Sequence, residues 1–266
     1  MLDLPVYLWA LVLIGAIGIP AVTAAGLFTS SLAAGGSRRA AGATAAGFAV
    51  AWAAWIVACA LLADHGAFRQ SASANRPWIG IAAAGALLAA LAGTAIGPVA
   101  RALRAPGSVA RLTLPQSLRV VGVAFLVVMA IGKLPAAFAL PAGLGDISVG
   151  IAAPFIARRL ARGDHRGAVW FNLFGILDLV VAVSLGFLGG LGPNQVLVLS
   201  PSTAAIALLP LALIPATAVP LALALHVTSL IRLRGAPAPA PHAPHLPTIP
   251  ASNRAAATGA AGRSPR

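Results

Sequence analysis

The sequence has no glutamate, a single lysine and a single cysteine. Its five acidic residues are all aspartates, and only 9% of its 266 residues are charged, against roughly 25% in an ordinary soluble domain. Because Cys59 is the only cysteine, an internal disulfide framework and a cysteine-rich metal site are excluded. With a mean hydropathy of +0.93, the chain does not have the composition of a water-soluble protein.

Common catalytic signatures are missing as well. The sequence contains no H-E-x-x-H, C-x-x-C, G-x-x-x-x-G-K-[ST] or G-x-S-x-G pattern, which argues against zinc-protease, thiol-redox, P-loop and serine-hydrolase mechanisms. His226 is the only histidine within an apolar segment, so a bis-histidine haem would lack a second ligand. We therefore expect no cofactor and no metal, and the sequence gives no basis for predicting an enzyme. His242 and His245 are expected to be solvated rather than ligands.

What the sequence does have is a series of apolar runs. Most of these runs approach the ~20 residues that a helix needs to cross ~30 Å of hydrocarbon, and the alternating pattern of an outer-membrane barrel is missing. The sequence thus predicts an all-α, polytopic transmembrane helical bundle. The seven predicted spans are residues 6–29, 41–63, 78–100, 118–140, 142–157, 168–190 and 203–231.

Basic residues are concentrated in alternate loops between these runs. The arginine-rich segments hold Arg38 and Arg39; Arg101, Arg104 and Arg111; Arg158, Arg159, Arg162 and Arg166; and Arg232 and Arg234. The positive-inside rule then places the amino terminus outside and the carboxyl terminus in the cytoplasm, so we expect a multi-pass protein of the inner membrane. The net charge of +13 is distributed over these loops, which favours contact with anionic lipid and not with nucleic acid.

The carboxyl-terminal segment differs from the rest of the chain. Residues 235–266 are rich in proline and alanine and have almost no bulky apolar side chain. A segment of this composition cannot bury a core, so we predict a disordered basic tail after a transmembrane domain formed by residues 1–234.

Arg119 marks the cytoplasmic end of the fourth predicted span, and three further charged residues lie deeper inside the spans: Lys133, Asp146 and Asp178. Charges at membrane depth are costly and usually pair or mark a functional pathway. A tight link between the fourth and fifth segments would bring Lys133 and Asp146 to similar depth, so we expect them to pair and Asp178 to remain as a titrating carboxyl group. A structural role is the alternative: a pair that fixes helix register, or an N-cap function for Asp146.

Pro210, Pro215 and Pro220 fall in the last predicted span. Proline removes a backbone donor and clashes with the preceding turn, so these residues are candidates for helix kinks. Broken helices line substrate sites in many transporters, although proline is also more frequent in membrane helices generally.

The stretch "RVVGVAFLVVMAIGKL" followed by "GDISVG", within residues 119–150, resembles the opening of DoxX-type small membrane proteins. That pattern commonly has glutamate where this chain has Asp146, and the three preceding segments have no counterpart in it. The resemblance implies a four-helix core formed by the fourth to seventh spans and a link to quinone or thiol redox chemistry.

Three hypotheses follow for function. The first is a proton-coupled permease for a small solute, with Asp178 titrating, Lys133 and Asp146 as a gate, and the proline-containing helix as the moving element. The second is a non-catalytic membrane subunit or assembly factor that binds a partner protein. The third is a redox-associated membrane protein.

Overall fold

A computed structural model describes residues 2–70, 77–190 and 195–234. Within these ranges every regular element is a helix, which confirms the all-α prediction for this part of the chain. The elements in chain order are α1 (Val6–Ala33), α2 (Arg38–Asp64), α3 (Trp78–Gly93), α4 (Gly97–Arg104), α5 (Ser108–Thr113), the 3₁₀ helix η1 (Leu114–Gly122), α6 (Val123–Ala130), α7 (Ala136–Ala161), α8 (Ala168–Leu188), the 3₁₀ helix η3 (Thr203–Ala207), the π-helix η4 (Ile214–Ala218) and α9 (Val219–Arg234).

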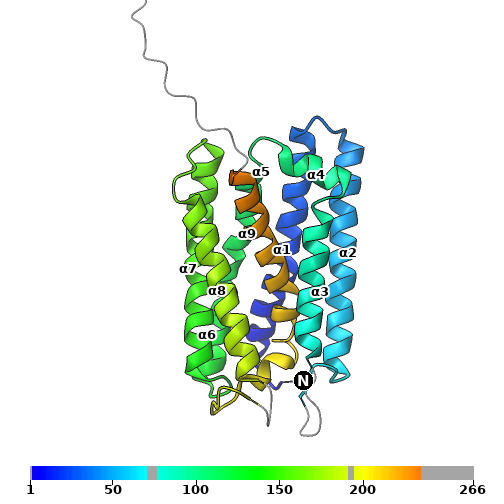
Figure 1. The fold of residues 1–266 in the computed structure, drawn as a ribbon. Coiled ribbons are helices and arrows are strands. Elements are labelled where there is room, and N and C mark those ends of the chain that lie inside the picture. The colour runs from blue at the N-terminus through cyan, green and yellow to red at the C-terminus, as the bar shows by residue number, and fades with distance from the viewer. Residues whose placement is uncertain (1, 71–76, 191–194, 235–266) are drawn as a thin grey trace, which may run out of the picture. The chain divides into compact units, whose positions relative to one another are not determined.

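The long helices run up and down beside one another as one bundle (Figure 1). Six helical stretches are long and apolar enough to cross a membrane: α1, α2, Ser108–Ala130, α7, α8 and Ile214–Arg234. Helices α3 and α4 reach that length only together, and they are bent by 74° at the break between them. The helices are therefore compatible with a membrane protein.

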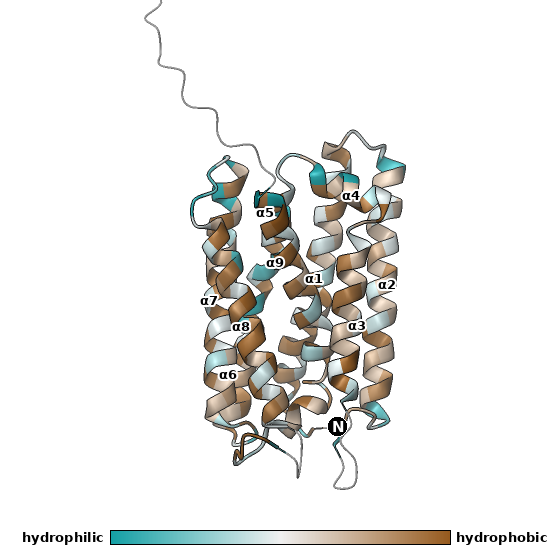
Figure 2. Ribbon diagram, viewed as in Figure 1, coloured by the Kyte–Doolittle hydropathy of each residue, from teal (hydrophilic) through white to brown (hydrophobic). Residues whose placement is uncertain are grey.

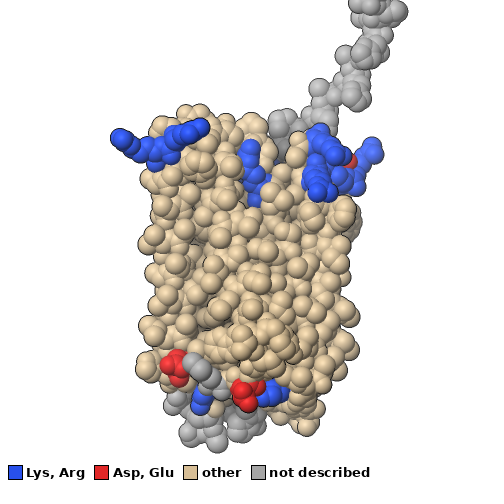
Figure 3. Space-filling model, turned by 180° about the vertical axis from the view of Figure 1, so that it is seen from behind, with Lys and Arg blue, Asp and Glu red and all other residues tan. Residues whose placement is uncertain are grey.

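Polar residues gather at the two ends of the bundle, while the middle of the helices is mostly hydrophobic (Figure 2). In the view from behind, basic side chains cluster at one end, and a few charges of both signs lie at the other (Figure 3). We call the end where α1 ends and α9 ends the arginine end; the other is the amino-terminal end. A belt without charge between two charged ends is the surface that a bilayer requires.

Two helical boundaries differ from the sequence prediction in a way that matters for function. The helical stretch at the fourth predicted span begins at Ser108 and not near residue 118, and the stretch at the last predicted span begins at Ile214 and not near residue 203. The 3₁₀ segment η1, which holds Pro115, continues directly from α5 into α6. Residues that the sequence assigned to a loop are therefore inside the bundle.

The turn between α6 and α7 is set by local chemistry. Gly132 has a φ of +75°, a conformation that L side chains rarely adopt, and Pro135 precedes the first residue of α7. Helix α7 then runs for 26 residues through Pro141 and Pro154, so the fifth segment is much longer than the predicted 142–157. The predicted disordered tail falls on residues 235–266, outside the described residues.

A buried polar cluster as the candidate functional site

Arg119 of η1 is the centre of a buried polar cluster. Its side chain is only 3% exposed, and its Nε donates to Oδ1 of Asp146 on α7 at 2.6 Å. Its Nη2 donates to Oδ2 of Asp178 on α8, whose side chain is 7% exposed. One guanidinium thus bridges two carboxylates from two different helices. Arginine suits this position because its planar fork presents several donors at once.

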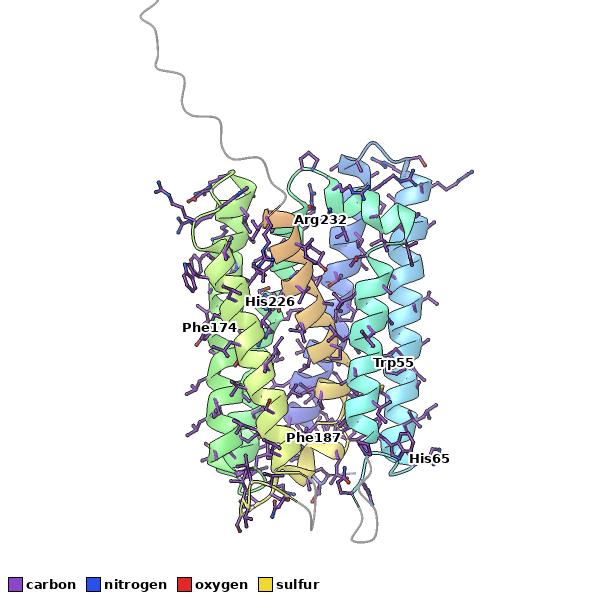
Figure 4. The ribbon with its side chains drawn as sticks, viewed as in Figure 1. Trp55, His65, Phe174, Phe187, His226 and Arg232 are labelled. Atoms are coloured by element: carbon purple, nitrogen blue, oxygen red, sulfur yellow. The ribbon has the colours of Figure 1, made fainter. Side chains whose placement is uncertain are left out.

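The cluster extends to α9 through a histidine. Arg119 Nη1 lies 3.2 Å from Nε2 of His226, which is fully buried. Because guanidinium is a donor only, Nε2 accepts and the ring hydrogen is on Nδ1, which donates to Oδ1 of Asn172 at 2.9 Å. Asn172 Nδ2 in turn donates to the carbonyl of Ala168 at 2.8 Å. The chain of bonds fixes one neutral tautomer of His226, whose position on α9 is labelled in Figure 4.

The 3₁₀ geometry of η1 places Gln116 and Arg119 on one buried face. Side chains three residues apart eclipse one another in a 3₁₀ helix, so these two point in similar directions, and Gly122 lies on the same face. Gln116 is buried and donates through Nε2 to the carbonyl of Ala222 on α9 at 2.9 Å. Its Oε1 has no partner among the described residues, so this acceptor is available inside the bundle.

Glycines on the facing helices make room for the cluster. A Cβ added at Gly145 would overlap the Asp178 carboxylate, and one added at Gly175 would overlap the His226 imidazole. Small residues let helices approach closely in membranes. At these two positions the missing side chain creates the space that a polar group fills.

A cavity reaches the cluster from the amino-terminal end of the bundle. It has a volume of about 100 Å³, room for several water molecules, and its walls include Ile79 of α3, Phe187 of α8 and Pro215 of η4. Asp146 lines the inner part of this cavity, and its side chain is 17% exposed, more than the two charged partners. A second, small cavity of about 30 Å³ touches both Arg119 and Asp146. Asp146 is therefore the charged group of the cluster with most access to the cavities.

The predicted pair of Lys133 and Asp146 is not formed. Lys133 lies in the turn after α6, at the amino-terminal end of the bundle, and its Nζ donates to the backbone carbonyl of Asp3 at 2.7 Å. The reason is that the helical stretch at the fourth predicted span starts earlier than expected. Because it begins at Ser108, Arg119 takes the central position and Lys133 lies past the helix end. Asp146 and Asp178 do come together, but through Arg119.

The three candidate kink prolines occupy different elements. Pro210 precedes the last membrane-length stretch, Pro215 lies in the π-helix η4, and Pro220 lies in the first turn of α9. Because η4 runs directly into α9, Pro220 is inside the continuous stretch Ile214–Arg234 and removes a backbone donor from it. The π-helical turn η4 lies just before Pro220, and its Pro215 lines the cavity that leads to Asp146.

Arg119, His226 and Asn172 were not among the predicted site residues. The sequence prediction starts the fourth span at residue 118, directly after the loop with Arg111, and this leaves Arg119 at the cytoplasmic end of the span. The available signal was the apolar run Leu112–Ala130, in which Arg119 is the one charged residue. A lone arginine in a run of that length is as unusual as the two aspartates.

Comparison with known protein families shows which family the chain belongs to. Residues 76–234 match the model of a domain of unknown function, DUF8737, so the chain belongs to this family. No curated protein and no solved structure matches the chain. The matched segment runs from just before α3 to the end of α9 and contains every member of the polar cluster; α1 and α2 precede it.

Proposed function

We propose that the protein is a proton-coupled permease for a small solute, with the buried polar cluster as its coupling site. The single observation that carries the proposal is the position of Asp146, bonded to Arg119 on one side and lining a cavity on the other. With neutral His226, one guanidinium and two carboxylates hold one net negative charge. Binding of one proton removes that charge, and a charge change in a low-dielectric site alters the stability of the ion pairs.

We further propose a membrane and an orientation for the protein. The protein is a seven-span protein of the inner membrane, with α3 and α4 together forming one bent span. Its arginine end faces the cytoplasm, in keeping with the positive-inside rule. The cavity at the amino-terminal end then opens to the outside, so that an external proton or solute reaches Asp146 first. In this mechanism η4 is the moving element, because a π-turn with proline has fewer regular backbone bonds to break.

The test is proton movement in vesicles loaded with a pH-sensitive dye. Amino acids, sugars, monocarboxylates and polyamines are added outside in turn, and internal acidification is followed for wild type, Asp146→Asn and Asp178→Asn. We expect one solute class to acidify wild-type vesicles and both variants to lose at least tenfold in rate. Asp164→Asn is the matched control, because Asp164 lies in the exposed turn after α7. Equal rates in wild type, both variants and protein-free vesicles for all four classes contradict the proposal.

A second candidate function is a non-catalytic membrane subunit or assembly factor. The observation that favours it is the closed bonding of Arg119, Asp146, Asp178, His226 and Asn172, which links η1, α7, α8 and α9. A network of this kind holds helices in register without any transported ligand. A stable partner that co-purifies with wild type and is lost from an arginine-end variant supports this function; a monomer with solute-dependent proton uptake contradicts it.

The third candidate is a redox-associated membrane protein. Arg119 and Asp146, both within the stretch that resembles DoxX-type proteins, form an ion pair, and this pairing is what favours the candidate. The test is a reduced-minus-oxidised difference spectrum of the purified protein after incubation with a short-chain ubiquinone. No spectral change beyond that of quinone in empty detergent micelles counts against it.

A further inference from the structure

A large apolar cavity lies on the other side of the bundle from the polar cluster. It has a volume of about 740 Å³ and is lined by residues of α1, α2, α3, α4 and α9. This volume is within the range of ~300–1,000 Å³ that is typical of ligand sites. Its walls are mostly alanine, glycine and large apolar side chains, Trp55 among them, with four threonines and Arg101 as the polar exceptions. Trp55, labelled in Figure 4, is held there by a bond from its Nε1 to the carbonyl of Ala216 at 2.9 Å.

The cavity exists because α2 and α3 are separated. Helix α2 packs along α1 but makes at most sparse contact with α3, and only 11% of its most apolar window is buried in the protein. The facing residues Gly47 and Gly85 would have open space around an added Cβ. Small residues normally let helices close up. Here the same residues border a cavity between the two helices.

Charge is placed at one end of this cavity only. The bend of 74° between α3 and α4 brings α4 across the arginine end, and Arg101 lines the 740 Å³ cavity there. Arg101 also lines an adjoining pocket of about 210 Å³ together with Ser31. Ser31 is 8% exposed, and its Oγ has no hydrogen-bond partner among the residues that the structure describes. In the described part of the chain, no acidic residue forms an ion pair with Arg101.

We propose that this pair of cavities binds one anionic phospholipid of the surrounding membrane. An acyl chain of the lipid lies in the apolar cavity between α2 and α3. The phosphate lies in the adjoining pocket against Arg101, with Ser31 as a hydroxyl donor. An apolar volume with a guanidinium at one end, which has no acidic partner among the described residues, matches an amphipathic anion. Arginine is also a strong partner for phosphate. The juxtaposition of these cavities with Arg101 is independent of the polar cluster.

The test is native mass spectrometry of the detergent-solubilised protein after incubation with equal amounts of phosphatidylglycerol and phosphatidylcholine. Gly47→Leu and Gly85→Leu fill the cavity from its two walls, without a clash with existing atoms at the added Cβ. We expect wild type to retain one more phosphatidylglycerol than either variant. Gly42→Leu is the matched control: Gly42 lies on α2 with open space around it but lines neither cavity, so this variant retains as much lipid as wild type.

The headgroup contact is tested separately. Arg101→Gln should retain a lipid but lose about fivefold in its preference for phosphatidylglycerol over phosphatidylcholine, the value expected for one arginine near an anionic headgroup. Arg104→Gln is its control, since Arg104 lies on α4 outside both cavities. Equal phosphatidylglycerol retention by wild type and both filled variants overturns the proposal. A wild-type dimer that Gly47→Leu converts to monomer also overturns it, because a second copy would then be the occupant.

Discussion

The two sides of the bundle use glycine in opposite ways. Around the polar cluster, Gly145 and Gly175 leave space that is occupied by a carboxylate and an imidazole from neighbouring helices. Between α2 and α3, Gly47 and Gly85 face empty volume. The same residue type, on helices of similar hydropathy, thus serves a close-packed polar centre on one side and an apolar cavity on the other. The difference lies in the neighbouring side chains and not in the glycines.

Removing the central cation should have the largest effect of any change considered. Arg119→Met leaves Asp146 and Asp178 buried without their partner, and breaking a buried pair in this way costs about 3–5 kcal/mol. We expect a large fall in the thermal midpoint in detergent. Adding Asp146→Asn and Asp178→Asn to the same chain should restore most of it, because the unpaired charges are then gone. Lys133→Met is the control, since Lys133 lies in a turn at the bundle end, and a fall as large as that of Arg119→Met would contradict the assignment.

Adding a single methyl group at Gly175 tests how closely the helices pack around the polar cluster. In Gly175→Ala the new Cβ overlaps the His226 imidazole, which is held by Arg119 and Asn172. The imidazole must shift and its bonds must weaken, so we expect destabilisation of about 1–3 kcal/mol, the usual cost of overpacking. The measurement is the thermal midpoint, together with the accessibility of His226 to diethylpyrocarbonate. An unchanged midpoint would mean that this side of the bundle is not close-packed.

The same substitution on the other side should have the opposite sign. A Cβ added at Gly85 meets no atom within 4 Å, so Gly85→Ala gains the helix preference of alanine without a clash. We expect a stabilisation of about 0.5–1 kcal/mol, seen as a small rise in the thermal midpoint. Gly85→Ala and Gly175→Ala are measured in the same detergent, and their thermal midpoints should shift in opposite directions. If both midpoints shifted in the same direction, the two sides of the bundle would not differ in packing as described.

These particular residues also show what could be predicted from the sequence. Apolar run lengths were enough to indicate the helices, and the rarity of charge was enough to select Asp146 and Asp178. The partner of the aspartates could not be chosen correctly, because the choice depends on where the fourth helical stretch begins. Pro115 and Arg111 look like loop residues, yet the 3₁₀ segment η1 continues the helix through them. The bond of His226 to Asn172 joins residues 54 positions apart, and no local pattern predicts that contact.

The smallest effect is expected where an arginine and an aspartate meet in water. Arg159 and Asp164 pair in the exposed turn after α7, with 2.8 Å between Nη2 and Oδ2. A hydrogen bond from the backbone N–H of Arg166, followed by one from Arg159, lowers the pKa of Asp164 below its ordinary value of 3.8. A lowered folded-state pKa gives stability that is present above the unfolded value and is lost as the pH falls through the folded value.

The midpoint difference between wild type and Asp164→Asn should therefore be small and constant near neutral pH and should vanish only in strong acid. It should also shrink with added salt, because exposed pairs are screened. The buried partners of Arg119 are screened much less, so the midpoint difference between wild type and Arg119→Met should keep most of its size in the same salt series. If salt reduced both differences equally, the cluster around Arg119 would be open to solvent, and the distinction between a closed polar centre and an exposed pair would fail.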